Sequence, residues 1–196
     1  MQNHKKVYIV QRLLVYWGNL NMIIVEGMDN TGKTTLVKNL AKEFKLEVRK
    51  TPQDVIMEPG RLLDWVDHEL DQVEVLPSLP FLYDRFPLIS EEVYGPILRG
   101  KSVVPGGSYE GWADRNHVLF IYCRPALDRI IDFGARDQMQ GVVQHAKDLT
   151  LAYDKLMYSY RFKGAGVVHY SYTHFDAYQR ARSAVQQYIN NYRLVE

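Results

Sequence analysis

The sequence is poor in cysteine and contains no long uninterrupted apolar run. Cys123 is the only cysteine among 196 residues, so no internal disulfide can form and nothing indicates secretion. The apolar stretch within residues 7–17 is interrupted by Gln11 and Arg12 and is too short to span a bilayer. The same two polar residues argue against a signal peptide. We therefore expect a cytoplasmic protein that does not associate with membranes.

The chain also lacks an excess of charge of either sign. Lys and Arg together number 24 and Asp and Glu number 23, which gives a formal net charge of +1. This balance argues against a strongly basic nucleic-acid-binding protein, although it allows a local basic groove. The length, the apolar share of 46% and the charged share of 24% favour one ordinary soluble domain with a good core.

The most informative stretch is residues 22–44. The letters MIIVE form a short aliphatic run typical of a buried strand, and apolar residues recur at helical spacing between 36 and 44. Between them, GMDNTGKT at 27–34 fits the pattern G-x-x-x-x-G-K-[ST] without a mismatch. A plain glycine-rich turn before a helix is the alternative, but the order of strand, loop and helix favours a phosphate-binding loop.

A loop of this kind would bind the polyphosphate of a nucleotide. Successive backbone N–H groups would point into one concavity, next to the positive end of the following helix. Lys33 would reach the β- and γ-phosphates, and the Thr34 hydroxyl would bind Mg²⁺, so we predict ATP and Mg²⁺ as cofactors. The residues predicted to bind the nucleotide are Gly27, Asp29, Asn30, Thr31, Gly32, Lys33, Thr34 and Thr35.

The rest of the chain alternates between strands and helices. Further strands are predicted over 46–50, 81–83, 118–123 and 166–172, and helices over about 61–75, near 127–131, over 142–160 and over 178–189. Such alternation indicates an α/β fold, a three-layer sandwich in which a five-stranded parallel sheet is covered on both faces. We expect the helix after Phe86 to be broken at Gly95-Pro96, and residues 100–116 to form a long surface loop.

Asp84 and Arg85 directly follow the strand predicted at 81–83. Ligands of α/β sheets bind beyond the carboxyl ends of the strands, so this position suits an acidic partner of Mg²⁺ or a general base. A surface ion pair between the two residues is the alternative interpretation.

Two segments have more than one interpretation. Residues 134–141, GARDQMQG, are polar and lie between two glycines, which fits either a lid hinge or a plain connection between helices. Residues 1–21 are expected to be an extension that the domain at 22–196 does not require. One apolar helix face in this extension could pack on the domain or on a partner, which leaves a homodimer open.

These motifs resemble those of thymidylate kinases. Residues 26–35 are similar to the phosphate loop of that family, and Tyr83-Asp-Arg-Phe86, followed by Ser90 and Tyr94, is similar to its element in which D-R-[YF] precedes S-x(3)-Y. The resemblance covers residues 22 to about 192. It implies the fold of a P-loop NTPase of the nucleotide kinase type, with a short lid around 134–141.

The resemblance also implies roles for individual residues. Asp29 matches the carboxylate that contacts the acceptor sugar hydroxyl, and Arg85 matches the arginine that holds the acceptor phosphate. Asp84 matches the acid near Mg²⁺, and Arg136 should be the lid arginine because the loop carries Asn30 where an arginine can stand. The expected catalytic residues are Lys33, Asp84, Arg85 and Arg136; the substrate-binding residues are Asp29, Arg85, Ser90 and Tyr94; the metal-binding residues are Thr34 and Asp84.

Three functions are compatible with these features. The favoured one is ATP- and Mg²⁺-dependent phosphoryl transfer to a small nucleotide acceptor, a pyrimidine deoxynucleoside monophosphate. The second is phosphorylation of hydroxymethyluracil within DNA, because kinases of that kind share the loop and the Asp-Arg element, and a broken helix with a wide loop could admit a polymer. The third is a non-catalytic nucleotide-dependent switch, although the chain lacks the N-K-x-D signature of GTPases.

Overall fold

Five parallel strands form the centre of the protein. The structure, a computed structural model, describes residues 22–52, 55, 58–75, 80–104, 118–131, 140–162 and 166–193. Within these ranges the sheet has the order β2-β3-β1-β4-β5. Its strands are β1 (Met22–Glu26), β2 (Val48–Arg49), β3 (Phe81–Asp84), β4 (Leu119–Cys123) and β5 (Gly166–Tyr170). The prediction of a five-stranded parallel sheet is therefore confirmed.

The central strand β1 is buried on both faces. Its residues pair in parallel register with β3 on one side, where Val25 lies opposite Asp84, and with β4 on the other, where Val25 lies opposite Ile121. Ile24 packs into one apolar cluster, whereas Val25 packs into a second one. This alternation, together with helices on both faces, explains why the strand reads as a continuous aliphatic run.

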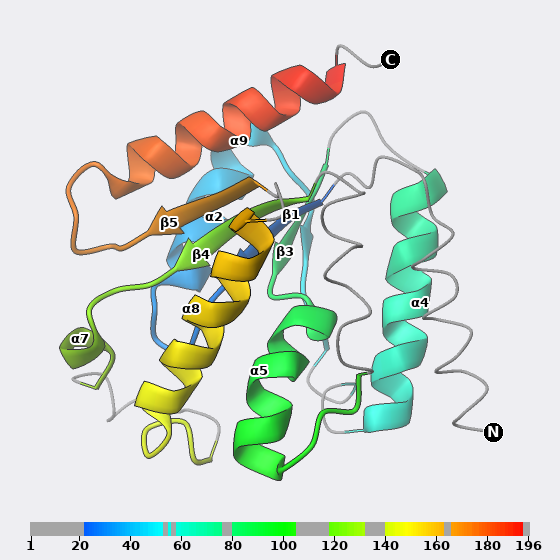
Figure 1. Ribbon diagram of the computed structural model, residues 1–196. Helices are drawn as coiled ribbons and strands as arrows, with labels where there is room; N and C mark the ends of the chain where they lie inside the picture. The colour runs from blue at the N-terminus through cyan, green and yellow to red at the C-terminus, as the bar shows by residue number, and fades with distance from the viewer. Residues whose placement is uncertain are drawn as a thin grey trace.

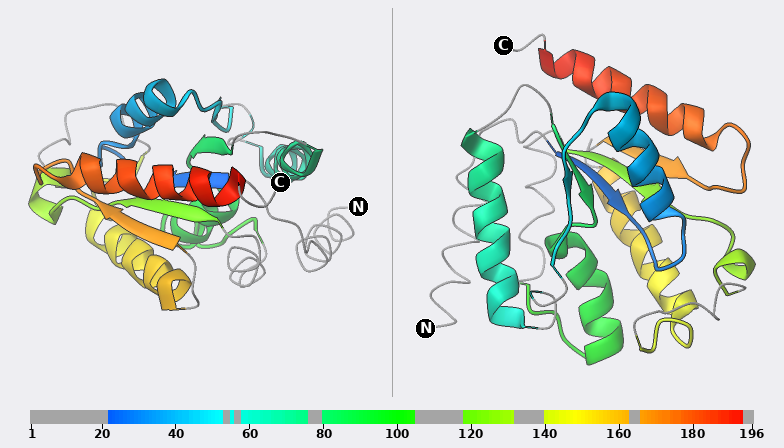
Figure 2. Two further views of the ribbon diagram at one scale, coloured as in Figure 1. Left: turned by 90° about the horizontal axis from the view of Figure 1, so that it is seen from above. Right: turned by 180° about the vertical axis from the view of Figure 1, so that it is seen from behind.

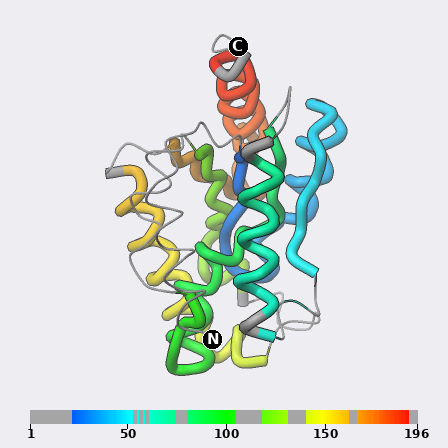
Figure 3. The backbone as a smooth tube through the Cα atoms, turned by 90° about the vertical axis from the view of Figure 1, so that its right-hand side faces the viewer, coloured from blue at the N-terminus to red at the C-terminus, as the bar shows by residue number. Residues whose placement is uncertain are grey.

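Helices cover both faces of the sheet and complete the predicted sandwich. On one face lie α2 (Lys33–Phe44) and α9 (Ala177–Arg193), and on the other lie α4 (Pro59–Val75), α5 (Pro87–Arg99) and α8 (Ala146–Phe162) (Figure 1). In the view from above in Figure 2, the sheet lies between α2 (blue) and α8 (yellow), and the side view in Figure 3 shows the same arrangement. The short helix α7 (Leu127–Ile131) follows β4.

The predicted break at Gly95-Pro96 is wrong, because α5 continues through both residues to Arg99. Phe86 is the N-cap of this helix, and Pro87 occupies its first turn, where a missing N–H costs nothing. The residue before a proline normally avoids helical angles because its Cβ is crowded, and Gly95 has no Cβ. A Cβ at Gly95 would also lie 2.7 Å from both Glu91 Oε1 and Ser102 Cα, so glycine is needed there for packing as well.

Several predictions concern residues outside the described ranges. These include the extension 1–21, most of the loop 100–116, and the lid segment around 134–141 apart from residues 140 and 141. Arg136 belongs to this group. Among the described helices, none combines the length and the apolar character needed to cross a membrane.

Candidate active site

The loop between β1 and α2 folds tightly against the end of β4. Gly27 has φ 138° and Gly32 has φ 86°, and both lie in a region that side chains rarely tolerate. A Cβ at Gly27 would lie 2.4 Å from the backbone oxygen of Cys123. Asn30 also adopts a positive φ of 60°, which asparagine tolerates better than most residues. The glycines of the motif are therefore required by the shape of the loop.

Lys33 lies over this loop. It is the first residue of α2 and is buried, and its Nζ donates hydrogen bonds to the backbone oxygen of Met28 and, at 3.4 Å, to Thr31 Oγ1. Burial lowers the pKa of Lys33 to about 8, and the charge of Arg85 acts in the same direction, while Asp29 and Asp84 oppose it. Nearby phosphate oxygens would favour the ammonium form, so this lysine suits a polyphosphate ligand.

A second cluster faces the loop from the turn after β3. The guanidinium of Arg85 forms an ion pair with Asp29 Oδ1 and donates a hydrogen bond to Tyr94 OH at 3.1 Å. Tyr94 OH also accepts a hydrogen bond from the backbone N–H of Asp29 at 3.2 Å. The side chains of Arg85 and Asp29 keep only 20% and 23% of their surface exposed. The interpretation of Asp84 and Arg85 as a surface ion pair is therefore wrong, because Arg85 pairs with the loop instead.

The surroundings of Arg85 favour its positive charge. Burial alone would lower its pKa, but Tyr94, Tyr153 and Asp29 hold the pKa well above the ordinary value. The guanidinium also lies 4.9 Å from the centre of the Tyr94 ring, at the distance of a cation–π contact. Burial in turn raises the pKa of Tyr94 to about 12. The cluster thus presents a permanent cation, held in one orientation, beside the phosphate-binding loop.

The other predicted site residues take different positions. Asp84 is buried at the end of β3, next to β1 in the sheet, and its charge acts on Lys33. Thr34 and Thr35 are exposed in the first turn of α2, whereas Thr31 is buried and its hydroxyl donates to the backbone oxygen of Met28 at 2.8 Å. Ser90 donates to the backbone oxygen of Phe86 in its own helix at 3.2 Å, and so it does not join the Arg85 cluster.

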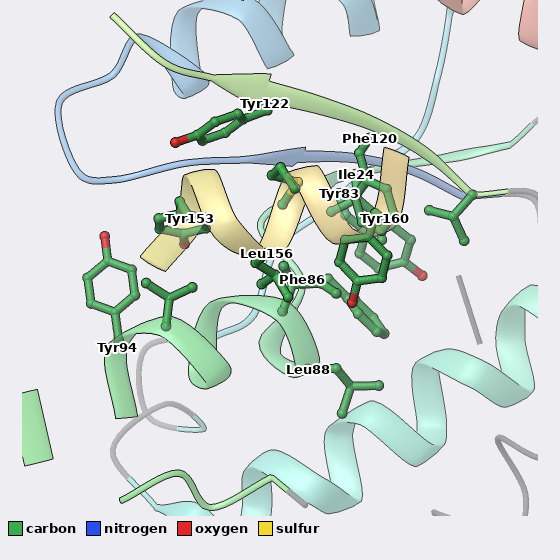
Figure 4. Close-up of a cluster of buried hydrophobic side chains, with 14 of the residues drawn as sticks. Ile24, Tyr83, Phe86, Leu88, Tyr94, Phe120, Tyr122, Tyr153, Leu156 and Tyr160 are labelled. Atoms are coloured by element: carbon green, nitrogen blue, oxygen red, sulfur yellow. The ribbon is translucent and has the colours of Figure 1, made fainter. Parts of the chain in front are cut away.

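Two residues that sequence reasoning missed connect these parts. Glu26, the last residue of β1, is fully buried, and its carboxylate accepts hydrogen bonds from Phe86 N at 2.8 Å and from Tyr153 OH at 3.0 Å. Tyr153 comes from α8 and packs edge-on against the Tyr94 ring, with 6.1 Å between ring centres (Figure 4). A glutamate at the end of an apolar strand is a weak signal of such a role, and nothing local marks Tyr153.

The sequence matches no protein-family model and no curated protein significantly, but several solved structures share the fold. One is the YorR protein of Bacillus subtilis in complex with phosphorylated GDP (TM-score 0.61, 15% identity, 86% of this chain and 95% of that chain). Another is deoxyadenosine kinase from M. mycoides with bound dATP (TM-score 0.52, 16%, 88% and 99%). A third is shikimate kinase from Acinetobacter baumannii in complex with shikimate (TM-score 0.50, 17%, 88% and 94%). At such identities the likeness establishes only the three-layer α/β fold that this chain shares with these structures.

The residues present fit a magnesium-bound polyphosphate. A loop that requires glycine at positions 27 and 32, a helix N-terminus and a buried lysine together suit phosphate oxygens. A threonine hydroxyl and a carboxylate are hard oxygen ligands of the kind that Mg²⁺ prefers, with substrate phosphates completing its coordination. In the described part of the chain, no three His, Cys, Asp or Glu side chains gather as a metal site of their own. The arrangement can therefore place charge around a transferring phosphoryl group on two sides.

Proposed function

We propose that this protein is an ATP- and Mg²⁺-dependent kinase that phosphorylates a nucleotide, a pyrimidine deoxynucleoside monophosphate. The observation that carries the proposal is the Arg85–Asp29–Tyr94 cluster, which joins the turn after β3 and α5 to the phosphate-binding loop. A fixed guanidinium matches the phosphate of a nucleoside monophosphate, a group that a neutral acceptor lacks. The resemblance to thymidylate kinases in the loop and in residues 83–94 supports a pyrimidine as the base of the acceptor.

The reaction needs positive charge on the transferring group and an aligned acceptor. Lys33 would hold the β- and γ-phosphates of ATP, and Thr34 and Asp84 would hold Mg²⁺, which neutralises charge on the phosphates. Arg85 would hold the acceptor phosphate so that an oxygen of this phosphate attacks the γ-phosphorus of ATP. The oxygen that links the β- and γ-phosphorus then leaves with ADP. Arg136, the proposed lid residue, would add a second arginine.

Structural relatives are consistent with this class of reaction. The deoxyadenosine kinase and the YorR protein were each solved with a nucleotide, and the shikimate kinase was solved with an anionic acceptor. DNA remains an alternative acceptor. The continuous α5 removes one of the two features that favoured a polymer, the broken helix. The second feature, the loop at 100–116, lies largely outside the described residues.

ADP release with a panel of acceptors tests the proposal. The panel contains pyrimidine and purine deoxynucleoside monophosphates, the matching nucleosides, and DNA carrying hydroxymethyluracil. We expect the pyrimidine monophosphates to give the highest kcat/KM, and preferential use of DNA would favour the alternative. Turnover with none of the acceptors, despite nucleotide binding, would favour the switch and refute a kinase.

Two variants with matched controls test the roles. Lys33→Ala should abolish turnover, whereas Lys38→Ala, an exposed lysine in the same helix, should not. Arg85→Ala should lower kcat/KM for the acceptor by about a hundredfold or more, because a charged hydrogen-bonding partner of the substrate is lost. Arg180→Ala removes an exposed arginine on α9 and should change little. Equally mild effects of Lys33→Ala and Arg85→Ala would contradict both roles.

A further inference from the structure

Glu26 joins three segments that build the candidate site. Its Oε1 accepts the hydrogen bond from Phe86 N at 2.8 Å, and its Oε2 accepts hydrogen bonds from Tyr153 OH at 3.0 Å and from Gly27 N at 3.4 Å. These donors belong to the turn after β3, to α8 and to the phosphate-binding loop. Because the carboxylate is fully buried, water cannot replace it in any of the three contacts.

The turn after β3 needs such support because Arg85 adopts a left-handed conformation. Its φ is 70°, which is unfavourable for a residue that carries a Cβ and persists only where the surroundings fix it. The backbone N–H of Arg85 donates to the oxygen of Val25 at 3.0 Å, and the next N–H, that of Phe86, donates to Glu26. These two bonds hold the peptide units on both sides of the Arg85 Cα, and so they set the direction in which its side chain leaves the backbone.

We propose that Glu26 is a positioning residue for the acceptor phosphate, acting through Arg85. The carboxylate fixes the left-handed turn, and the turn aims the guanidinium at Asp29 and Tyr94. Tyr153 contributes from the other side, since its hydroxyl holds Oε2 while its ring packs against Tyr94. The inference rests on the proposed function, because that function assigns the acceptor phosphate to Arg85.

The chain offers a matched control for this role. Glu69 on α4 is also buried, and its carboxylate accepts a hydrogen bond from Tyr83 OH at 3.0 Å, the same distance as in the Glu26–Tyr153 pair. Glu69 contacts Tyr83 and Arg49 rather than Arg85 or Phe86. Replacing Glu69 with glutamine therefore measures what the loss of a buried carboxylate does to the fold, without changing the Arg85 turn.

Steady-state kinetics of Glu26→Gln and Glu69→Gln separate a positioning role from a packing role. Glutamine keeps the shape of the side chain, but it places an NH₂ group where a donor already points. We expect Glu26→Gln to raise the KM for the acceptor about tenfold, with the KM for ATP changed less than about twofold. Glu69→Gln should leave the KM for the acceptor and the KM for ATP within about twofold of the values for the unmodified protein. An equal rise of both KM values in Glu26→Gln, or no rise, would overturn the proposal.

Combining variants tests whether the effect passes through Arg85. In an Arg85→Ala background, Glu26→Gln should lower acceptor kcat/KM by less than about twofold further, because residues that act as one unit are not additive. Full additivity would overturn the proposal. If Glu26→Gln does not fold, Tyr153→Phe replaces it, with an expected rise of about threefold in acceptor KM and the same non-additivity with Arg85→Ala.

A readout without substrate keeps this inference distinguishable from the proposed function. The Nε–H resonance of Arg85 in a ¹⁵N-labelled sample is assigned by its loss in Arg85→Lys. It should move toward the position of exposed arginines in Glu26→Gln and stay in place in Glu69→Gln. An unchanged Arg85 resonance in Glu26→Gln would refute the positioning role. Failure of the proposed function would appear differently, as absence of acceptor phosphorylation by the unmodified protein.

Discussion

Replacing Gly27 with alanine tests the close contact between the phosphate-binding loop and β4. The added Cβ would lie 2.4 Å from the backbone oxygen of Cys123, whereas ordinary contact begins at 3.4 Å, so the two groups would have to separate by 3.4 − 2.4 = 1.0 Å. Neither can yield easily, since the loop backbone carries one group and the other is the backbone oxygen of Cys123, which is paired with Tyr170 of β5. The φ of 138° at Gly27 adds strain that is independent of this overlap.

The expected cost follows from these two contributions. A non-glycine residue in this backbone region costs about 1–3 kcal/mol, and an extra methyl group in a packed site costs about as much. Alanine recovers about 0.4–1 kcal/mol by restricting the unfolded chain. We therefore expect Gly27→Ala to lower the free energy of unfolding by about 3 kcal/mol.

Gly100→Ala is the matched control for this substitution. Gly100 also has a positive φ, 72°, but a Cβ there would meet nothing within 4 Å. Its cost should be about 0.5 kcal/mol, because the left-handed strain is partly offset by the gain in the unfolded state. Gly32→Ala should lie in between, because its Cβ would meet a side chain, that of Tyr172, at 3.0 Å.

Urea unfolding followed by circular dichroism measures the three free energies. The rise in melting temperature with ADP measures nucleotide binding in the same samples. We expect the loss of stability to be largest in Gly27→Ala, smaller in Gly32→Ala and smallest in Gly100→Ala. We also expect ADP to no longer raise the melting temperature of Gly27→Ala, whether or not the same is true of the Gly32→Ala variant. If the free energies of unfolding of Gly27→Ala and Gly100→Ala differ by less than about 0.5 kcal/mol and ADP still raises both melting temperatures, the close contact matters neither for stability nor for nucleotide binding.

Two further predictions concern Lys33 and Tyr94. Burial lowers the pKa of Lys33 to about 8, and bound phosphates should raise it again, so ADP binding should take up protons near pH 8 and weaken as the pH rises from about 7 to about 9. Calorimetry in buffers of different ionisation enthalpy measures this uptake, and proton release would contradict it. Tyr94→Phe keeps the ring but removes the hydroxyl that accepts hydrogen bonds from Arg85 and Asp29, so acceptor kcat/KM should fall about fivefold with the KM for ATP unchanged. An unchanged kcat/KM would show that the hydroxyl is not needed.

The sequence was sufficient for the parts of the site that are local in the chain. The phosphate-binding loop is one contiguous motif between a strand and a helix, and its glycines adopt the positive φ angles that the motif predicts. Asp84 and Arg85 could be placed because the end of a parallel strand has a fixed relation to the crevice. The sheet followed from the alternation of strands and helices, although β2 spans only Val48–Arg49 where five residues were predicted.

The parts that failed depend on contacts between distant segments. The proline in α5 is tolerated because Gly95 has no Cβ to crowd it. The same glycine lets residues 101 and 102 approach the helix, and local propensity does not reveal such packing. Glu26 and Tyr153 are 127 positions apart, and the tyrosine lies on a helix face that reads as ordinary core. Periodicity identifies which face of a helix is buried, but it does not tell which buried hydroxyl meets which buried carboxylate.

Lys33 and Arg85, the cations of the site within the described residues, already have partners, and this determines what a ligand must do. Lys33 donates to a backbone oxygen of the loop and Arg85 pairs with Asp29, so phosphates would exchange these partners rather than add to them. Because both side chains are already removed from water, the exchange costs little further desolvation, and the surrounding low dielectric strengthens each new contact. Under the proposed function, the exchange at Arg85 also frees the Asp29 carboxylate to accept a hydrogen bond. The acceptor phosphate would thereby prepare the group that receives the sugar hydroxyl, so recognition of the two ends of a nucleotide would be coupled through one ion pair.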